Sequence, residues 1–212
     1  MTDGREVKGH AMRVRLRAAA ESLIAETGME TATTVEIARR CGVSRGAMLH
    51  HYPRRNDIII DTAWHVWDRA RDVTSRLADD MVEGRLSLRE FISRMYEEVF
   101  PQRSMLIMLE LLVAGRSDTE LGRAVSEILT DLFRFYEKFC TRAFAARGAS
   151  PEQIRSVVTL VVSTLRGLRV QHIADPGNTD VQAVQVVLLG VIEHLMGVDT
   201  PRTKGPAKRK RT

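Results

Sequence analysis

With 212 residues, 5% of them aromatic, and few strand-like runs, the sequence indicates an all-α protein with either one large domain or a small domain joined to a larger one. The net charge of +5 is uneven: residues 1–55 carry ten Lys and Arg against six Asp and Glu, residues 201–212 carry six against none, and residues 56–200 carry the balance of −5. Two distant cysteines exclude a disulfide framework or a zinc site, and no apolar run approaches the roughly 20 residues that span a bilayer.

A basic N-terminal part on an acidic remainder suits a protein that meets a polyanion at one end only. Scattered surface charge would give the same totals. The N-terminus lacks the apolar stretch of a signal peptide, so we expect a cytoplasmic protein.

The first predicted element is a helix from about His10 to Gly28. Residues 1–8 are polar and contain a glycine, so we expect a leader without fixed structure there. One apolar stripe runs along the helix: Met12, Leu16, Ala19, Ala20, Leu23 and Ile24. Three arginines lie near its start: Arg13, Arg15 and Arg17. They either approach DNA phosphates or remain ordinary solvated arginines.

Two short helices around a tight turn are predicted next. Thr33 or Thr34 can cap the first, and Gly42 permits the left-handed backbone that ends it. Ser44 can cap the second, which Pro53 stops. The inward positions are Val35, Ile37, Ala38 and Cys41 on the first helix and Val43, Met48 and Tyr52 on the second. This arrangement is a helix-turn-helix.

The outer face of the second helix has residues that suit DNA. Arg45, at the helix start, can reach a guanine edge in the major groove, and Gly46 allows close approach of the backbone. His50, His51 and Arg55 suit phosphates. Helix-turn-helix geometry also occurs incidentally in helical domains, and adjacent histidines are often ordinary surface, so the geometry leaves both interpretations open.

The run from Thr34 to Asp57 resembles the DNA-binding domain of the TetR family of transcriptional regulators, as does its place behind one long helix near the N-terminus. The residues that carry the resemblance are Thr34, Ile37, Ala38, Gly42, Val43, Ser44, Arg45, Gly46, the group His50-His51-Tyr52-Pro53, Arg55 and Asp57. The resemblance covers about the first quarter of the chain closely, and the remainder is similar only in helical architecture. Together with the N-cap Ser44, the DNA-contacting set that it implies is Thr34, Ser44, Arg45, Gly46, Ala47, Leu49, His50, His51 and Arg55.

One residue departs from the family pattern. Leu49 stands where the family usually has a tyrosine. Leucine cannot hydrogen-bond a phosphate, although it can pack on a thymine methyl group.

A long helix is predicted from Arg54–Asp57 to about Val82, joining the DNA-reading part to the body. Ser87 can cap a helix from about Leu88 to Phe100. The next stretch, Met105–Val113, is apolar on nearly every side except at Glu110. Because an unpaired buried carboxylate is costly, Glu110 is expected at an edge, paired within the protein, or paired with a ligand's cation.

Residues 118–147 support one long helix with two apolar stripes, which need two burial partners. Residues 151–174 contain a β-branched run that propensity alone would make a strand, but their length and Ser-Pro start favour a helix. Arg166 and Arg169 in this helix must reach an edge or find carboxylates. We expect a homodimer through residues 118–147 and 151–174 as a four-helix bundle, with burial inside one subunit as the alternative.

The last predicted helix runs from about Asp180 to Met196. Its expected inward positions are Val184, Val187, Leu188, Val191 and Leu195. Residues 201–212 combine proline, glycine and charge, which predicts a disordered basic tail that adds non-specific DNA affinity or only aids solubility.

The predicted domains are residues 1–55 for DNA binding, 56–200 for ligand binding and dimerisation, and 201–212 as the tail. The predicted function is a transcriptional regulator, a repressor whose homodimer binds a palindromic operator. The TetR resemblance implies a small-molecule pocket in the body, whose occupation releases the DNA. Its candidate residues are Trp67, Met95, Met108, Glu110, Leu112 and Tyr136.

Two other classes of function are open. A helical enzyme or ligand carrier would have an incidental helix-turn-helix, but the sequence offers no catalytic constellation, metal-ligand spacing or phosphate loop, and no cofactor is expected. A ligand-free architectural protein would bind DNA with little sequence preference.

Overall fold

The structure, a computed structural model, describes residues 4–144 and 148–197, and every regular element in those ranges is helical. The α-helices are α1 (Gly4–Thr27), α2 (Thr34–Cys41), α3 (Arg45–His51), α4 (Arg55–Val82), α5 (Leu88–Arg94), α6 (Gln102–Ala114), α7 (Thr119–Phe144), α8 (Pro151–Ala174) and α9 (Val181–Met196). A 3₁₀ turn, η1 (Met29–Thr31), follows α1, and a π-helical turn, η2 (Met95–Val99), continues α5. The all-α fold is confirmed. The expected tail lies outside the described residues.

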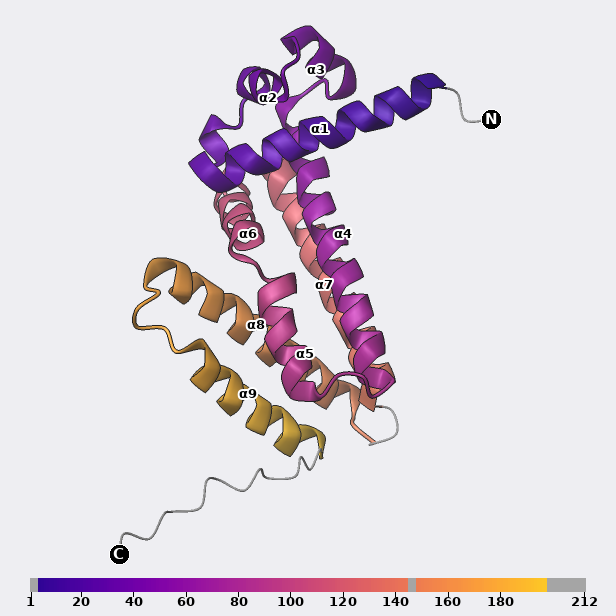
Figure 1. Cartoon of the computed structure of the whole chain (residues 1–212), viewed down its shortest axis with the longest axis vertical. Coiled ribbons are helices and arrows are strands. Elements are labelled where there is room, and N and C mark those ends of the chain that lie inside the picture. Colours follow the sequence, from indigo (N-terminus) through magenta and orange to yellow (C-terminus); the bar gives the residue numbers. More distant parts are fainter. Residues whose placement is uncertain (1–3, 145–147, 198–212) are drawn as a thin grey trace, which may run out of the picture.

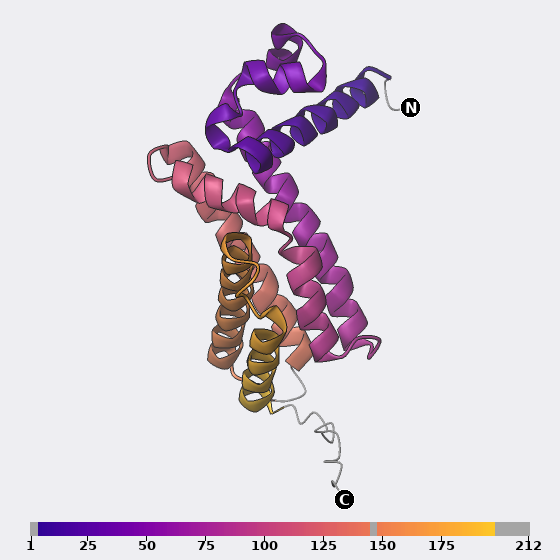
Figure 2. The same cartoon turned by 60° about the vertical axis from the view of Figure 1, so that its left-hand side comes forward.

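The molecule is elongated, with α1, α2 and α3 gathered at one end (Figure 1). From that end α4 runs down the body beside α7, on which it packs. The end of α6 lies against α1, while α8 and α9 pair along the flank of the body (Figure 2). The predicted architecture, a three-helix unit joined by a long helix to a larger helical part, is therefore confirmed. None of the described helices has the length and apolarity needed to cross a membrane.

One continuous apolar cluster runs through both parts of the molecule. It includes fully buried side chains in the three-helix unit, such as Leu16 and Met48, and others in the body, such as Ile107 and Leu165. The two parts therefore share a core along α4, and the division at residues 55 and 56 stays a prediction.

Two predicted element bounds differ from the structure. Helix α1 begins at Gly4. The expected leader without fixed structure, residues 1–8, is therefore wrong from Gly4 onward, where the residues belong to the helix. The predicted helix up to Phe100 changes type after Arg94: in η2 the Phe100 N–H donates to Met95 O over 3.1 Å, a five-residue step. Such π-helical turns are often found at functional sites.

Both apolar stripes of α7 are partly buried within the chain. Side chains from each stripe, Leu132 and Tyr136, are 3% and 4% exposed. The fully exposed positions of α7 are all polar: Thr119, Arg123, Ser126, Glu127, Thr130, Arg134, Lys138, Thr141 and Arg142. Helices α4 and α8 of the same subunit pack on α7. Five residues of the two stripes remain only half-buried: Leu129, Phe133, Phe135, Phe139 and Cys140. A part for residues 118–147 in a dimer therefore stays a prediction.

Helix α9 is rotated relative to the sequence expectation. Of the predicted inward positions only Leu188 is buried, and the buried face is completed by Leu189, Ile192 and Met196. The other four predicted inward residues are exposed: Val184, Val187, Val191 and Leu195. A helix that is apolar nearly all round gives no period from which to choose its inner face.

The corner between α6 and α7 is a close backbone contact. A Cβ atom added to Gly122 would lie 2.6 Å from the carbonyl oxygen of Gly115, and one added to Gly115 would lie 2.9 Å from the Gly122 Cα. Because both obstacles are backbone atoms, no side chain can move aside to make room. The end of α6 is thus fixed against the start of α7.

Candidate nucleic-acid interface

Helix α2 forms as its capping signals predict. The Thr33 hydroxyl accepts a hydrogen bond from Glu36 N–H over 3.2 Å, and Gly42 ends the helix in the left-handed region at φ 71°. Ile37 and Ala38 are buried as expected. Val35, which was expected to face inward, is 56% exposed, so the expectation for this residue is wrong.

Helix α3 opens at Ser44 and ends before Pro53. The Ser44 hydroxyl accepts a hydrogen bond from Ala47 N–H over 3.1 Å, and Tyr52 leaves helical geometry at φ −137°. Met48 and Tyr52 are buried on the inner side. The outer side presents Arg45, Gly46, Ala47 and His50 to solvent, with Leu49 and His51 half-buried at its margins.

The charge on this outer face is concentrated at Arg45. Its side chain has no hydrogen bond or ion pair among the described residues, so it is free to meet a base edge or a phosphate. His50 and His51 lie edge to face, with ring centroids 5.4 Å apart. Burial, with smaller contributions from His50 and Arg13, lowers the pKa of His51, which favours its neutral form at pH 7.

Arg13, Arg15 and Arg17 of α1 contact protein groups. The Arg13 guanidinium lies 5.4 Å from the centre of the Tyr52 ring, and Arg15 donates to the carbonyl of Cys41 over 2.8 Å. Arg17 pairs with Asp61 of α4, which also accepts the hydrogen bond of the Tyr52 hydroxyl. Burial, followed by the bond to Asp61, raises the pKa of Tyr52. These contacts tie α2 and α3 to α1 and α4. Arg13 and Arg15 remain exposed, and contact of the three arginines with DNA phosphates stays a prediction.

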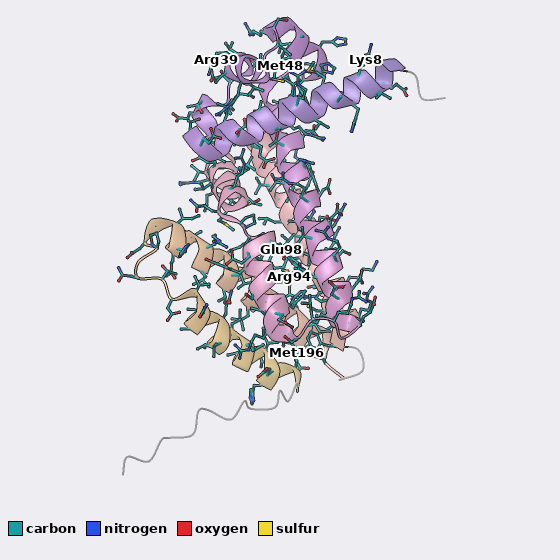
Figure 3. All side chains as sticks on the ribbon, in the orientation of Figure 1. Lys8, Arg39, Met48, Arg94, Glu98 and Met196 are labelled. Atoms are coloured by element: carbon teal, nitrogen blue, oxygen red, sulfur yellow. The ribbon has the colours of Figure 1, made fainter. Side chains whose placement is uncertain are left out.

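Two predicted contact residues lie away from the outer face of α3. Thr34 is the first residue of α2 and is half-buried. The Arg55 side chain turns toward the loop after α1, where its Nε donates to Ala32 O over 2.9 Å and another of its nitrogens donates to Met29 O. Figure 3 shows Met48 within this end of the molecule, with Arg39 and Lys8 to either side. Contact of the nine predicted residues with DNA stays a prediction.

The loop after α1 is also held from the body. Glu110 of α6 accepts a hydrogen bond from Met29 N–H over 2.6 Å and lies against Gly28, whose φ is 87°. Of the options considered for Glu110, pairing within the protein is therefore the one observed. A cleft of about 790 Å³ beside this contact is lined by residues of the loop and by the ends of α6 and α7.

Two further contacts join the start of α4 to the start of α7. Arg54 pairs with Glu120 at 2.8 Å, and the Asn56 amide donates to Asp118 over 2.8 Å. Sequence reasoning missed these partners. The only available signal was Glu110, the single charge of the apolar stretch Met105–Val113, because a pairing across dozens of residues leaves no mark in local spacing.

The predicted pocket residues divide into three groups. Trp67, Met108 and Tyr136 line one internal cavity of about 40 Å³, and Met95 lines a second cavity of the same size, of which Tyr136 is also a wall. Leu112 is 41% exposed and lines neither cavity, and Glu110 lies at the loop contact. Arg166 also lines the first cavity, a position that the sequence did not indicate.

Comparisons with known proteins agree with this arrangement. The family described as bacterial regulatory proteins, tetR family, matches residues 16–62. The HTH-type transcriptional regulator CymR of Pseudomonas putida is 24% identical over 165 residues, which are 75% of this chain and 78% of CymR. The HTH-type transcriptional regulator BetI of Escherichia coli is 33% identical over 95 residues, which are 45% of this chain and 39% of BetI.

Solved structures share the fold. The crystal structure of a transcriptional regulator from Rhodococcus sp. Rha1 has a TM-score of 0.69 at 20% identity, covering 86% of this chain and 96% of that one. A structure from Saccharomonospora viridis, described as a transcriptional regulator in complex with choline, has a TM-score of 0.64 at 19% identity, covering 86% and 95%.

Proposed function

Because the chain belongs to the tetR family of bacterial regulatory proteins and is a helix-turn-helix transcriptional regulator, we propose that it is a repressor. Its homodimer binds a palindromic operator, and a small molecule in the body releases it. The observation that carries the proposal is the outer face of α3, which is solvent-exposed, short enough for a major groove, and headed by an arginine that has no partner in the described part of the chain.

DNA reading is assigned to the N-terminal half of α3. Arg45 donates to a guanine, while Gly46 and Ala47 let the helix backbone approach the groove. In this proposal half-buried Leu49 packs on a thymine methyl, and His50 and His51 bind phosphates. Thr34, Ser44 and Arg55 complete the proposed set at the margins. Arg55 would reach DNA only if it left the loop carbonyls that it now binds.

We assign the dimer surface to α8 and α9 rather than to residues 118–147. Helix α9 exposes an apolar stripe that includes Val187 and Leu195, at 68% and 41% exposure. The adjacent exposed positions of α8 include Ser163 and Gly167, small enough for a second helix to come close. Two copies joined here would present two recognition helices, which must lie roughly 34 Å or a multiple of a helical turn apart to read a palindrome.

Helix α6 is the proposed route from ligand to DNA. Met105 and Met108 lie at the body cavity, and Glu110, less than two turns further on, holds the loop that leads into α2. A ligand that displaces α6 therefore shifts the loop that supports α2 and the recognition helix α3. The ligand-free and ligand-bound states then differ in affinity for DNA. The choline complex of the Saccharomonospora viridis protein supports a ligand site in bodies of this fold.

The proposal is tested by selecting binding sites from random duplexes with the purified full chain, followed by gel shifts at several salt concentrations. We expect enrichment of a palindrome, and binding that survives moderate salt only on that palindrome. Salt-sensitive binding without enrichment would favour the architectural protein. No mobility shift even at low salt would favour the helical enzyme or carrier.

A further inference from the structure

The first body cavity combines apolar walls with one cationic side chain. Its apolar lining includes Trp67, Met105 and Leu132, contributed by three different helices. Arg166 of α8 enters this lining and lies with its guanidinium carbon 5.7 Å from the centre of the Phe100 ring. A cation in such a cavity needs an explanation, because it has lost part of its hydration.

Arg166 has no carboxylate to balance it. The residue is partly buried, its Nε is fully buried without a hydrogen-bond partner, and none of its nitrogens has an ion pair or a hydrogen bond among the described residues. Burial lowers the pKa of Arg166, although an arginine stays charged in proteins. The contact with the Phe100 ring offsets only part of this cost.

Arg169, one turn further along α8, has the partners that Arg166 lacks. It is 7% exposed, and it donates to Phe100 O over 2.8 Å and to Tyr96 O over 2.9 Å. It also stacks on Tyr96 and approaches Glu97 at 3.3 Å. Arg169 therefore holds η2 through its donors, whereas the donors of Arg166 have no acceptor among the described residues.

A second donor lines the same cavity. Tyr136 is 4% exposed, and its buried hydroxyl makes no hydrogen bond of acceptable geometry with any described residue; the nearby Thr74 hydroxyl donates to Ala70 O. Burial raises the pKa of Tyr136 to about 12, so the hydroxyl keeps its proton. The cavity thus offers donors on Arg166 and Tyr136, and the missing partner is an anionic acceptor.

We propose that the effector of this protein is a small organic anion, a carboxylate on an apolar body. The carboxylate binds Arg166 and the Tyr136 hydroxyl, and the apolar part packs on Trp67, Met105 and Met108. This assignment rests on the proposed function only in calling the ligand an effector. Arg166 is then the residue that determines specificity, since it rejects ammonium ligands by charge repulsion.

Such a ligand must enlarge the cavity, whose volume is about 40 Å³. The walls allow this, because methionine side chains are unbranched and adaptable. Among the described residues, Tyr136 is the only one that also lines the second cavity of about 40 Å³, so a shift of its ring would change the shape of both. The turn η2 lies along both, with Met95 lining the second cavity and Val99 the first.

The test uses the emission of Trp67, which touches the cavity, in a Trp64→Phe background that removes the other tryptophan. Hexanoate, octanoate, benzoate and phenylacetate are titrated into the DNA-free chain beside their amides and the corresponding alkyl- and arylalkylammonium ions. We expect at least one carboxylate to shift the emission and raise the Tm, with its amide and ammonium analogues at least about tenfold weaker. Equal binding of a carboxylate and its amide, or no binding by any carboxylate at millimolar concentration, overturns the proposal.

Two variants locate the charge that matters. Arg166→Met should weaken carboxylate binding about tenfold or more without lowering the Tm of the free protein, since it replaces an unbalanced cation by an apolar chain. Arg89→Met, at an exposed arginine of α5, should change neither. Arg166→Lys keeps the charge and should lose only part of the affinity. Retained binding in Arg166→Met contradicts the assignment. Because the titration contains no DNA, its failure leaves operator binding standing, and a failed site selection leaves the carboxylate site standing.

Discussion

At the scale of single residues, charge alone did not separate DNA contacts from internal ones. Arg15 and Arg17 lie in the sequence where a phosphate contact was one of two options, yet they hold Cys41 O and Asp61. Arg45 has the same chemistry and remains unpaired, because Ser44 places it on the solvent side of a new helix. Local capping could be read from the sequence, whereas partners on other helices could not.

Arg45→Ala should weaken binding to the selected operator by about 1 to 3 kcal/mol and relax the preference at one base position. The reason is the loss of a bidentate contact to a guanine edge. Fluorescence anisotropy on operators substituted one position at a time would measure both effects, with Arg89→Ala as the control.

An equal loss on all sequences would mean that Arg45 binds only phosphates. No loss at all would remove α3 as the reading element.

At the scale of elements, prediction succeeded where short-range chemistry decides. The bounds of α2 and α3 follow from Thr33, Gly42 and Ser44, and the start of α8 follows from Ser150, whose hydroxyl accepts from Gln153 N–H over 3.2 Å. The inner face of α9 and the π-helical turn η2 failed, because both depend on which helices pack alongside. The cavity could not be predicted for the same reason: its lining joins α4, α6, α7 and α8.

Gly42→Val should destabilise the α2–α3 turn by roughly 1–2 kcal/mol or more, because valine is strained at a φ of 71°. No atom would clash with the new Cβ, so the cost is conformational. We expect operator affinity to fall while the body still dimerises, measured by gel shift and sedimentation.

Gly84→Val is the matched control, with a φ of 76° and equal space, but at the turn between α4 and α5. It should cost similar stability and leave DNA affinity nearly unchanged. Equal operator affinity of the two variants would contradict a specific role of the α2–α3 turn in DNA binding.

Glu110→Ala should loosen the loop after α1. Met29 is 5% exposed, and its N–H would lose its acceptor at a cost of about 1–3 kcal/mol. Hydrogen exchange of residues 28–32 should accelerate, and operator binding should weaken. Glu110→Gln, which keeps an acceptor oxygen, should restore most of the protection; unchanged exchange in Glu110→Ala would contradict the contact.

At the scale of the whole molecule, the distribution of exposed apolar side chains indicates where a second copy would bind. Among the described residues, α9 has the most exposed large apolar side chains, whereas the fully exposed positions of α7, which the sequence analysis paired with residues 151–174 as the interface, are all polar. The two stripes of α7 could not reveal this, since a pattern states that a face is buried but not which chain buries it.

Val187→Asp should convert the dimer to a monomer, because a carboxylate would be buried against its symmetry mate. Sedimentation velocity measures the mass, and operator affinity should fall with it. Val82→Asp, at an exposed valine near the end of α4, should remain dimeric. A dimeric Val187→Asp protein would move the interface away from α9.

The close contact between Gly115 and Gly122 holds the end of α6 in place, so a displacement of this helix grows with distance from Gly115. Suppose that α6 rotates about Gly115. Glu110 is five residues, or about 7.5 Å, from this rotation point, and Met105 is ten residues, or about 15 Å, from it. The displacement of Glu110 is then about one half of the displacement of Met105. A displacement of roughly 2 Å at Met105 arrives as about 1 Å at Glu110, enough to stretch its 2.6 Å bond to Met29 beyond hydrogen-bonding range, whereas a displacement half as large would leave it intact. DNA release should therefore depend on ligand size through a threshold. Small ligands should bind without releasing the DNA, and larger ligands should release it.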